Sequence, residues 1–166
     1  MATQNDDLPL LIELHKDKLT ARQRHIAVAK LVTDYEFNNA YQYVINREDT
    51  HLQWLEAAIA KLGGTPSTVP EPSVEGVWAK PNSNERFMPR VSEDSKAAAD
   101  FVAKWRPKAA GIHSDRDRKL AGVIIGETLE QKRFFDQMLA GQDDLLGRRM
   151  KGASTGDGVM PVRWVE

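Results

Sequence analysis

Apolar residues recur at intervals of three and four along four stretches of the chain, which is the spacing of one face of an α-helix. We find no convincing alternation of apolar and polar residues of the kind that marks a β-strand. The pattern therefore predicts an all-α protein with four long helices, over residues 9–32, 34–62, 93–110 and 115–140.

The ends of these helices carry recognisable signals. Thr33 stands three residues before Glu36, the spacing of a capping box at the start of the second helix. Gly63 ends that helix, Ser114 is the expected N-cap of the fourth, and Gly141 ends the fourth. Because very few residues separate the helices within each pair, we expect two antiparallel helical hairpins.

A long proline-rich connection, residues 63–92, joins the two hairpins. A helix of about 25 residues spans roughly 38 Å, so a connection of this length can return along the bundle. The third helix would then run parallel to the second, starting from the opposite end. The remaining residues, 141–166, form a C-terminal tail that we expect to be loosely ordered, and the whole chain, 1–166, is expected to be a single domain.

Residues equally distant from the turn of a helical hairpin face each other. Counted from the two predicted turns, Glu48 lies opposite Lys18, and Glu127 lies opposite Ala98. A further polar residue follows each acid by three positions, which keeps it on nearly the same helix face. The residues expected near the middle of the bundle are Lys18, Glu48, His51, Ala98, Glu127 and Glu130.

The stretch REDTHLQWLEAAIAKLGGTP, residues 47–66, resembles the second-helix pattern of the ferritin-like superfamily, closest to rubrerythrin and bacterioferritin. That pattern is Glu-x-x-His, an amphipathic run, and then Leu-Gly-Gly-x-Pro. The stretch KDKLTARQRH, residues 16–25, resembles the first metal-bearing helix of bacterioferritin, in which a Glu precedes Leu-Thr-Ala. The resemblance covers both hairpins and implies a ferritin-like antiparallel four-helix bundle with a di-iron site.

In that family each hairpin supplies a Glu from its first helix and a Glu-x-x-His from its second. Carried onto this chain, Glu48 and His51 match in full. Glu127 matches the acid of the second hairpin, and Glu130 stands where a His is usual. The resemblance therefore implies Glu48, His51, Glu127 and Glu130 as candidate metal ligands.

Lys18 and Ala98 stand where the family's first and third helices supply carboxylates. Two metal ions about 3.5–4 Å apart need several anionic oxygens, so the di-iron site is expected to be lost or altered. Lys18 could itself be the compensating cation, paired with Glu48 or Glu127. If Lys18 instead points outward, the four candidate ligands could hold a single Fe, Mn or Zn ion.

Three further features of the predicted helices carry expectations of their own. His25 lies one heptad after Lys18 and opposite Tyr41, so both residues are candidates to contact the metal ligands and adjust their properties. The alternative for His25 is a hydrogen-bonded histidine in the core. His15 lies beside the same stripe and is expected at the surface. In the fourth helix, two glycines four residues apart leave a gap that packing within the chain, a ligand or a subunit neighbour could each use; they are Gly122 and Gly126.

Composition narrows the class of protein. The formal net charge is −1 and there is no cysteine, so thiolate ligands and disulfides are excluded. We expect no nucleic-acid partner, because the chain has no excess of basic residues and its basic clusters are not interleaved with aromatic residues. No apolar run is long enough for a membrane span, and no basic segment followed by an apolar one opens the chain, so we expect a cytoplasmic protein without a membrane partner.

Two functions of different classes follow from these observations. The first is a binding or structural role, as a homodimer, for a ferritin-like protein that has lost its metal. The second is a variant iron or manganese redox protein acting on oxygen or peroxide. A bundle interior lined by alanine and glycine could also accommodate a small apolar ligand.

Overall fold

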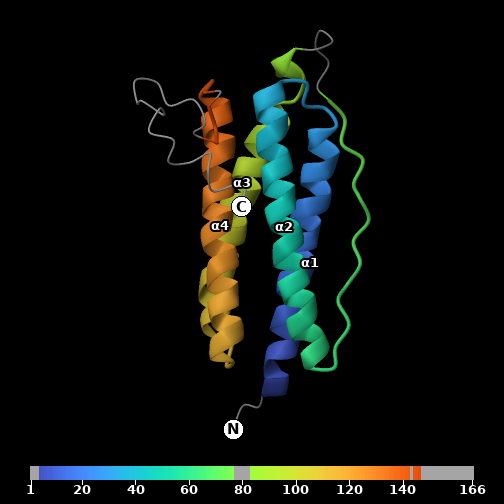
Figure 1. Cartoon of the computed structure of the whole chain (residues 1–166), viewed down its shortest axis with the longest axis vertical. Coiled ribbons are helices and arrows are strands. Elements are labelled where there is room, and N and C mark those ends of the chain that lie inside the picture. Colours follow the sequence, from blue (N-terminus) through green and yellow to red (C-terminus); the bar gives the residue numbers. More distant parts are fainter. Residues whose placement is uncertain (1–3, 77–82, 143, 147–166) are drawn as a thin grey trace, which may run out of the picture.

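The computed structural model describes residues 4–76, 83–142 and 144–146, and these residues form four long helices (Figure 1). Two short 3-10 helices, η1 and η2, precede the first and third of them. No strand occurs among the described residues, which confirms the prediction of an all-α protein with four helices. The elements are η1 (Gln4–Asp7), α1 (Leu8–Ala29), α2 (Tyr35–Lys61), η2 (Asn84–Arg86), α3 (Met88–Ala110) and α4 (Asp115–Leu139).

The helices pack as two pairs, α1 with α2 and α3 with α4, and α1 also contacts α3 while α2 contacts α4. In Figure 1, α1 and α4 run upward, whereas α2 and α3 run downward. The connection from α2 to α3 climbs along the outer side of α1 and returns the chain to the upper end. Every helix among the described residues is too short or too polar to cross a membrane.

Three of the four predicted helix-end signals are found where the sequence placed them. Gly63 and Gly141 follow α2 and α4 with φ angles of 76° and 75°, which an L-residue with a side chain rarely adopts. Ser114 caps α4 through its hydroxyl. The prediction for α2 is wrong by one residue, because Asp34 rather than Thr33 is the N-cap, and its carboxylate accepts a backbone hydrogen bond of 3.0 Å.

The third helix starts earlier than predicted, at Met88 instead of residue 93. Pro89 lies in its first turn, where the missing N–H costs nothing and the fixed φ suits a helix. Phe87, just before the helix, is fully buried and anchors its start. Asp94, which falls in the first turn of the predicted helix 93–110, lies instead well inside α3 and on its buried face.

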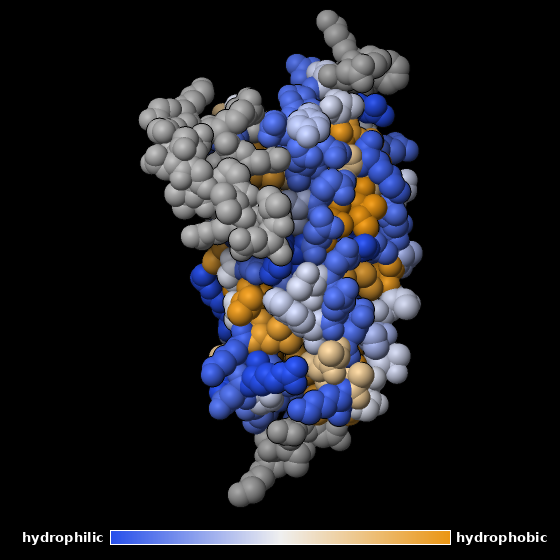
Figure 2. Space-filling view, in the orientation of Figure 1, coloured by the Kyte–Doolittle hydropathy of each residue, from blue (hydrophilic) through white to orange (hydrophobic). Residues whose placement is uncertain are grey.

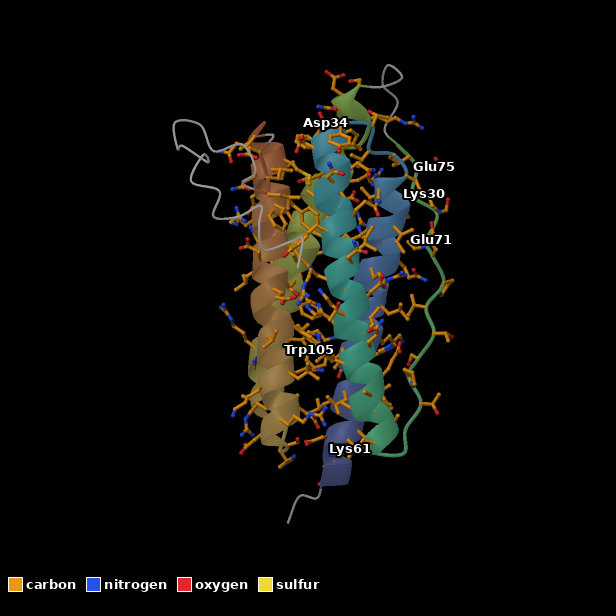
Figure 3. All side chains as sticks on the ribbon, in the orientation of Figure 1. Lys30, Asp34, Lys61, Glu71, Glu75 and Trp105 are labelled. Carbon is orange, nitrogen blue, oxygen red and sulfur yellow. The ribbon has the colours of Figure 1, made fainter. Side chains whose placement is uncertain are left out.

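The hydrophobic core has two separate parts, one in each half of the bundle. Trp105, in the lower half, points into the space between the helices (Figure 3). The upper cluster includes Val28, Phe37, Tyr41, Phe87, Phe135 and Met138. The lower cluster includes Leu11, Leu14, Leu55, Ile59, Trp105 and Ile124. A layer of buried polar side chains lies between the two clusters.

The crossover is fixed to the outside of the bundle along its described part. Gln23 donates a hydrogen bond of 3.0 Å to the backbone oxygen of Val69. Lys30 forms an ion pair with Glu71, and both residues are labelled in Figure 3. The predicted connection, 63–92, and tail, 141–166, each extend into residues outside the described ones.

Candidate functional site

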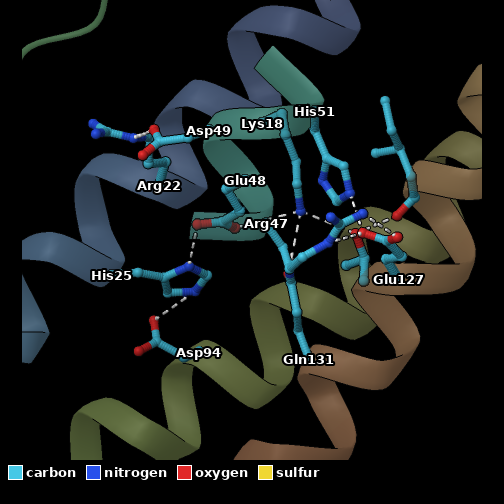
Figure 4. A network of polar contacts seen from close by, with 12 residues as sticks. Lys18, Arg22, His25, Arg47, Glu48, Asp49, His51, Asp94, Glu127 and Gln131 are labelled. Atoms are coloured by element: carbon cyan, nitrogen blue, oxygen red, sulfur yellow. Dashed lines mark hydrogen bonds and ion pairs between the residues drawn. The ribbon is translucent and has the colours of Figure 1, made fainter. Parts of the chain in front are cut away.

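Lys18 lies at the centre of the polar layer and points from α1 into the bundle (Figure 4). Its side chain is 1% exposed, and its Nζ lies 3.4 Å from Oε1 of Glu48 on α2. The same ammonium donates hydrogen bonds of 3.0 Å to Oγ1 of Thr128 and 3.2 Å to Oε1 of Gln131 on α4. Its charge also faces the ring of Phe101 on α3, 5.1 Å from the centroid. Lys18 therefore touches side chains from the three other helices.

Glu48 lies between two basic groups. Its carboxylate is fully buried, with one oxygen facing Lys18 and the other accepting a hydrogen bond of 2.9 Å from Nδ1 of His25. Burial alone would raise the pKa of Glu48, but His25 and Lys18 together hold that pKa below its ordinary value. Glu48 is therefore ionised at neutral pH, inside the bundle.

A second buried carboxylate, Asp94 on α3, continues the layer beyond His25. Nε2 of His25 lies 3.9 Å from Asp94 Oδ1, and Arg24 donates a hydrogen bond of 2.6 Å to that oxygen. The hydroxyl of Tyr41 donates a hydrogen bond of 2.6 Å to the other oxygen. Asp94 is fully buried, so the hydrogen bonds from Arg24 and Tyr41 replace those that water would supply.

Ionisation of the two bases in the layer depends on these acids. Burial lowers the pKa of Lys18, although the charge of Glu48 partly opposes this effect. Burial also disfavours the charged form of His25, but Glu48 and Asp94 outweigh it and raise the pKa of His25. The buried layer thus holds two carboxylates, Glu48 and Asp94, against two basic side chains, Lys18 and His25.

At the α2–α4 edge of the layer, His51 and Arg47 share the carboxylate of Glu127. Arg47 donates two hydrogen bonds, of 3.1 Å and 2.6 Å, to its two oxygens, and His51 Nε2 donates to one of them. Burial and the charge of Lys18 lower the pKa of His51, which keeps its ring neutral. Burial would raise the pKa of Glu127, but Arg47 and His51 hold that pKa below its ordinary value.

Three of the four candidate metal ligands come together at this level, and the fourth does not. Glu48, His51 and Glu127 all contribute to the layer, whereas Glu130 faces outward, has a side chain 51% exposed and pairs with Arg133. Glu127 itself lies at the edge of the interface, with its side chain 31% exposed. A residue three positions further along is rotated by about 60° and so lies outside the bundle.

The residues present do not fit a di-metal centre. Ala98 is buried on α3 and offers no ligand atom, and the ammonium of Lys18, 3.4 Å from Glu48, would repel a metal ion bound there. Both oxygens of Glu127 already bind nitrogen donors. Among the described residues, no group of three or more His, Cys, Asp or Glu side chains has an arrangement that could hold a metal ion.

Sequence reasoning placed one histidine wrongly and missed several partners of the layer. His15 is 1% exposed rather than at the surface, and its Nε2 lies 3.2 Å from Glu56 across the α1–α2 interface. The stripe of α1 that faces α2 is wide enough to include it. The missed partners are Arg24, Arg47, Asp94, Thr128 and Gln131. For Asp94 and Thr128 a signal existed, since each lies in step with the apolar face of its helix.

Comparison of the chain with protein-family models, with curated proteins and with solved structures finds no match.

Proposed function

We propose that the chain is a ferritin-like four-helix protein in which a buried lysine has replaced the metal centre, and that it acts as a binding or structural protein rather than as an oxidoreductase. The observation that carries this proposal is the position of Lys18, whose ammonium lies 3.4 Å from Glu48 and is 1% exposed. A buried carboxylate needs a counter-charge, and here an amino group of the protein supplies it.

The order and direction of the helices support the ferritin-like part of the proposal. The two pairs of helices are joined by one long crossover on the outside of the bundle, and α2 and α3 run in the same direction (Figure 1). Among four-helix bundles, one long crossover is typical of the ferritin-like class. Glu48 and His51 then stand on α2 at the level where that class binds metal.

The contacts that Glu48 and Glu127 already make argue against the alternative, a variant iron or manganese redox protein. Such a protein would need Lys18 to leave the layer and Glu127 to release Arg47 and His51. Moving Lys18 would leave the buried charge of Glu48 without its nearest cation, which is costly. Freeing Glu127 would break its ion pair with Arg47 and its hydrogen bond with His51. A protein without a resident metal needs neither step.

A gain-of-metal experiment tests the proposal. The double variant Lys18→Glu/Ala98→Glu supplies the two missing carboxylates and removes the repelling ammonium, so we expect it to retain Fe(II) or Mn(II) after desalting when the wild type does not. Ala98→Glu alone should fail, because Lys18 still occupies the site. The measurement is the metal content per chain by plasma mass spectrometry.

Lys16→Glu is the matched control, since Lys16 is an exposed lysine two residues away on the same helix. It adds the same charge outside the layer and should retain no metal. A folded double variant that binds no more metal than this control would count against descent from a di-metal centre. Metal bound by the wild type as well would favour the redox alternative.

A further inference from the structure

Three polar side chains of the buried layer each have an atom without a hydrogen-bond partner among the described residues. These atoms are Oε1 of Glu48, Nδ1 of His51 and Nε2 of Gln131. In Figure 2, hydrophilic side chains make up most of the visible face, where water pairs with them. The three side chains of the layer are not part of any surface, since each is at most 3% exposed. Leaving a buried polar group unpaired is costly, so three of them in one layer indicate a further molecule that pairs with them.

The three atoms surround the ammonium of Lys18. Lys18 donates a hydrogen bond of 3.2 Å to Oε1 of Gln131, so the amide nitrogen of the same side chain also lies beside it. Oε1 of Glu48 lies 3.4 Å from the ammonium, which is longer than the roughly 2.7–2.9 Å of a charged hydrogen bond. His51 follows Glu48 by one turn of α2, and its ring lies next to the Lys18 side chain (Figure 4).

The hydrogen-bonding character of each atom follows from the other contacts of its side chain. Oε1 of Gln131 accepts a hydrogen bond from Lys18, so Nε2 at the other side of the amide is a donor. Nε2 of His51 donates to the carboxylate of Glu127 and the ring is neutral, so Nδ1 is an acceptor. The carboxylate oxygen of Glu48 is a second acceptor. The layer therefore offers one donor group and two acceptors to a bound molecule.

Charge and size limit the class of molecule that fits. A cation would lie beside the ammonium of Lys18 and would give Gln131 no acceptor. An anion would lie beside the buried carboxylate of Glu48 and would give His51 no donor. The layer lies between two packed apolar clusters, so the molecule must also be small. Water is small and neutral, both donates and accepts, and makes about three hydrogen bonds when it is buried in a protein.

The third helix leaves room for such a molecule. Asp94, Ala98 and Phe101 share one face of α3, at spacings of four and three residues. Asp94 faces His25 and Phe101 faces Lys18, so Ala98 lies between these two contacts. Ala98 is buried and has only a methyl group as its side chain. The other three helices contribute long polar side chains at this level, whereas α3 contributes almost no volume between Asp94 and Phe101.

We infer that the polar layer binds one water molecule, which accepts a hydrogen bond from Nε2 of Gln131 and donates to Nδ1 of His51 and Oε1 of Glu48. With this water, hydrogen bonds continue across the bundle from Glu127 on α4 to His25 on α1. The site is selective for a neutral molecule, because a positive and a negative group lie on either side of it. The inference goes beyond the proposed function, since it holds whether or not the layer descends from a metal centre.

A high-resolution crystal structure of the wild-type protein tests the inference directly. We expect one electron-density peak about 2.7–3.2 Å from each of the three atoms. A layer in which no peak contacts all three atoms would overturn the inference, and the proposed function would stand as long as Lys18 still faced Glu48. A peak about 2.0–2.2 Å from His51 with the anomalous signal of a transition metal would contradict both.

Oxygen-17 relaxation dispersion of the solvent gives a second test, because it counts the water molecules that a protein holds for longer than nanoseconds. We expect Gln131→Leu to hold one such water fewer per chain than the wild type, since leucine removes the donor and still favours a helix. Gln53→Leu is the matched control, because Gln53 is exposed on α2, and it should hold the wild-type number. Far-UV circular dichroism verifies that both variants are folded. An equal number of long-lived waters in the wild type and in folded Gln131→Leu would overturn the inference.

Discussion

Replacing Lys18 with methionine should lower the free energy of unfolding by about 3–5 kcal/mol. Methionine matches the length of the lysine stem but removes the charge that faces Glu48 at 3.4 Å. Glu48 is fully buried, so its ionised form would then depend on His25 alone. Thr128 and Gln131 would lose their donor at the same time. Urea unfolding followed by circular dichroism measures the change.

Two further variants show whether the loss comes from the ion pair. Lys16→Met removes an exposed lysine two residues away on α1 and should change stability little. In Lys18→Met/Glu48→Gln both charges are absent, so part of the lost stability should return, since removing both partners of a buried pair costs less than removing one. If Lys18→Met were as stable as Lys16→Met, the ammonium would have no role in balancing Glu48.

Asp94→Ala should destabilise the protein by about 3 kcal/mol, although Asp94 was not among the site residues predicted from the sequence. Its two oxygens receive hydrogen bonds of 2.6 Å from Arg24 and from the hydroxyl of Tyr41. Alanine would leave that hydroxyl unpaired in the core and would remove the second carboxylate beside His25. The same unfolding experiment measures the effect.

Tyr41→Phe is the comparison for this variant, because it removes a single hydrogen bond and leaves Asp94 in place. It should cost about 1–2 kcal/mol, less than Asp94→Ala. An Asp94→Ala variant no less stable than Tyr41→Phe would show that the contacts of Asp94 with Arg24 and His25 do not contribute. The polar layer would then be limited to Lys18, Glu48 and the residues that they contact.

The helices and the level of the polar layer could be predicted because both follow from the spacing of residues along the sequence. Amphipathic spacing defines the four helices, and glycines mark the ends of α2 and α4. Positions equally distant from a short turn then face each other. This places Lys18 opposite Glu48, and in the structure the two side chains form an ion pair. The direction of the Lys18 side chain could not be predicted from residue spacing, because a long basic side chain can also extend to solvent from a half-buried position.

The partners on α3 and α4 were harder to predict because they depend on the rotation of each helix. A later expected start for α3 left Asp94 at a helix end, where an acid is common for reasons of the helix dipole alone. The true start at Met88 places it two turns in, in step with Val91 and Ala98 on the buried face. Glu130 was predicted to face inward because its spacing from Glu127 matches that of His51 from Glu48. Glu127 lies at the edge of the α2–α4 interface, so Glu130, one turn further along, faces solvent.

The metal content of the purified wild-type protein is the first quantity to measure. The protein is loaded separately with Fe(II), Mn(II) and Zn(II), desalted and analysed by plasma mass spectrometry, with Glu48→Ala treated in parallel. If Lys18 neutralises the layer, the wild type should retain no more metal than the variant does. One or two ions per chain in the wild type, lost in Glu48→Ala, would contradict the replacement of the metal by Lys18 and would identify a metal-binding protein.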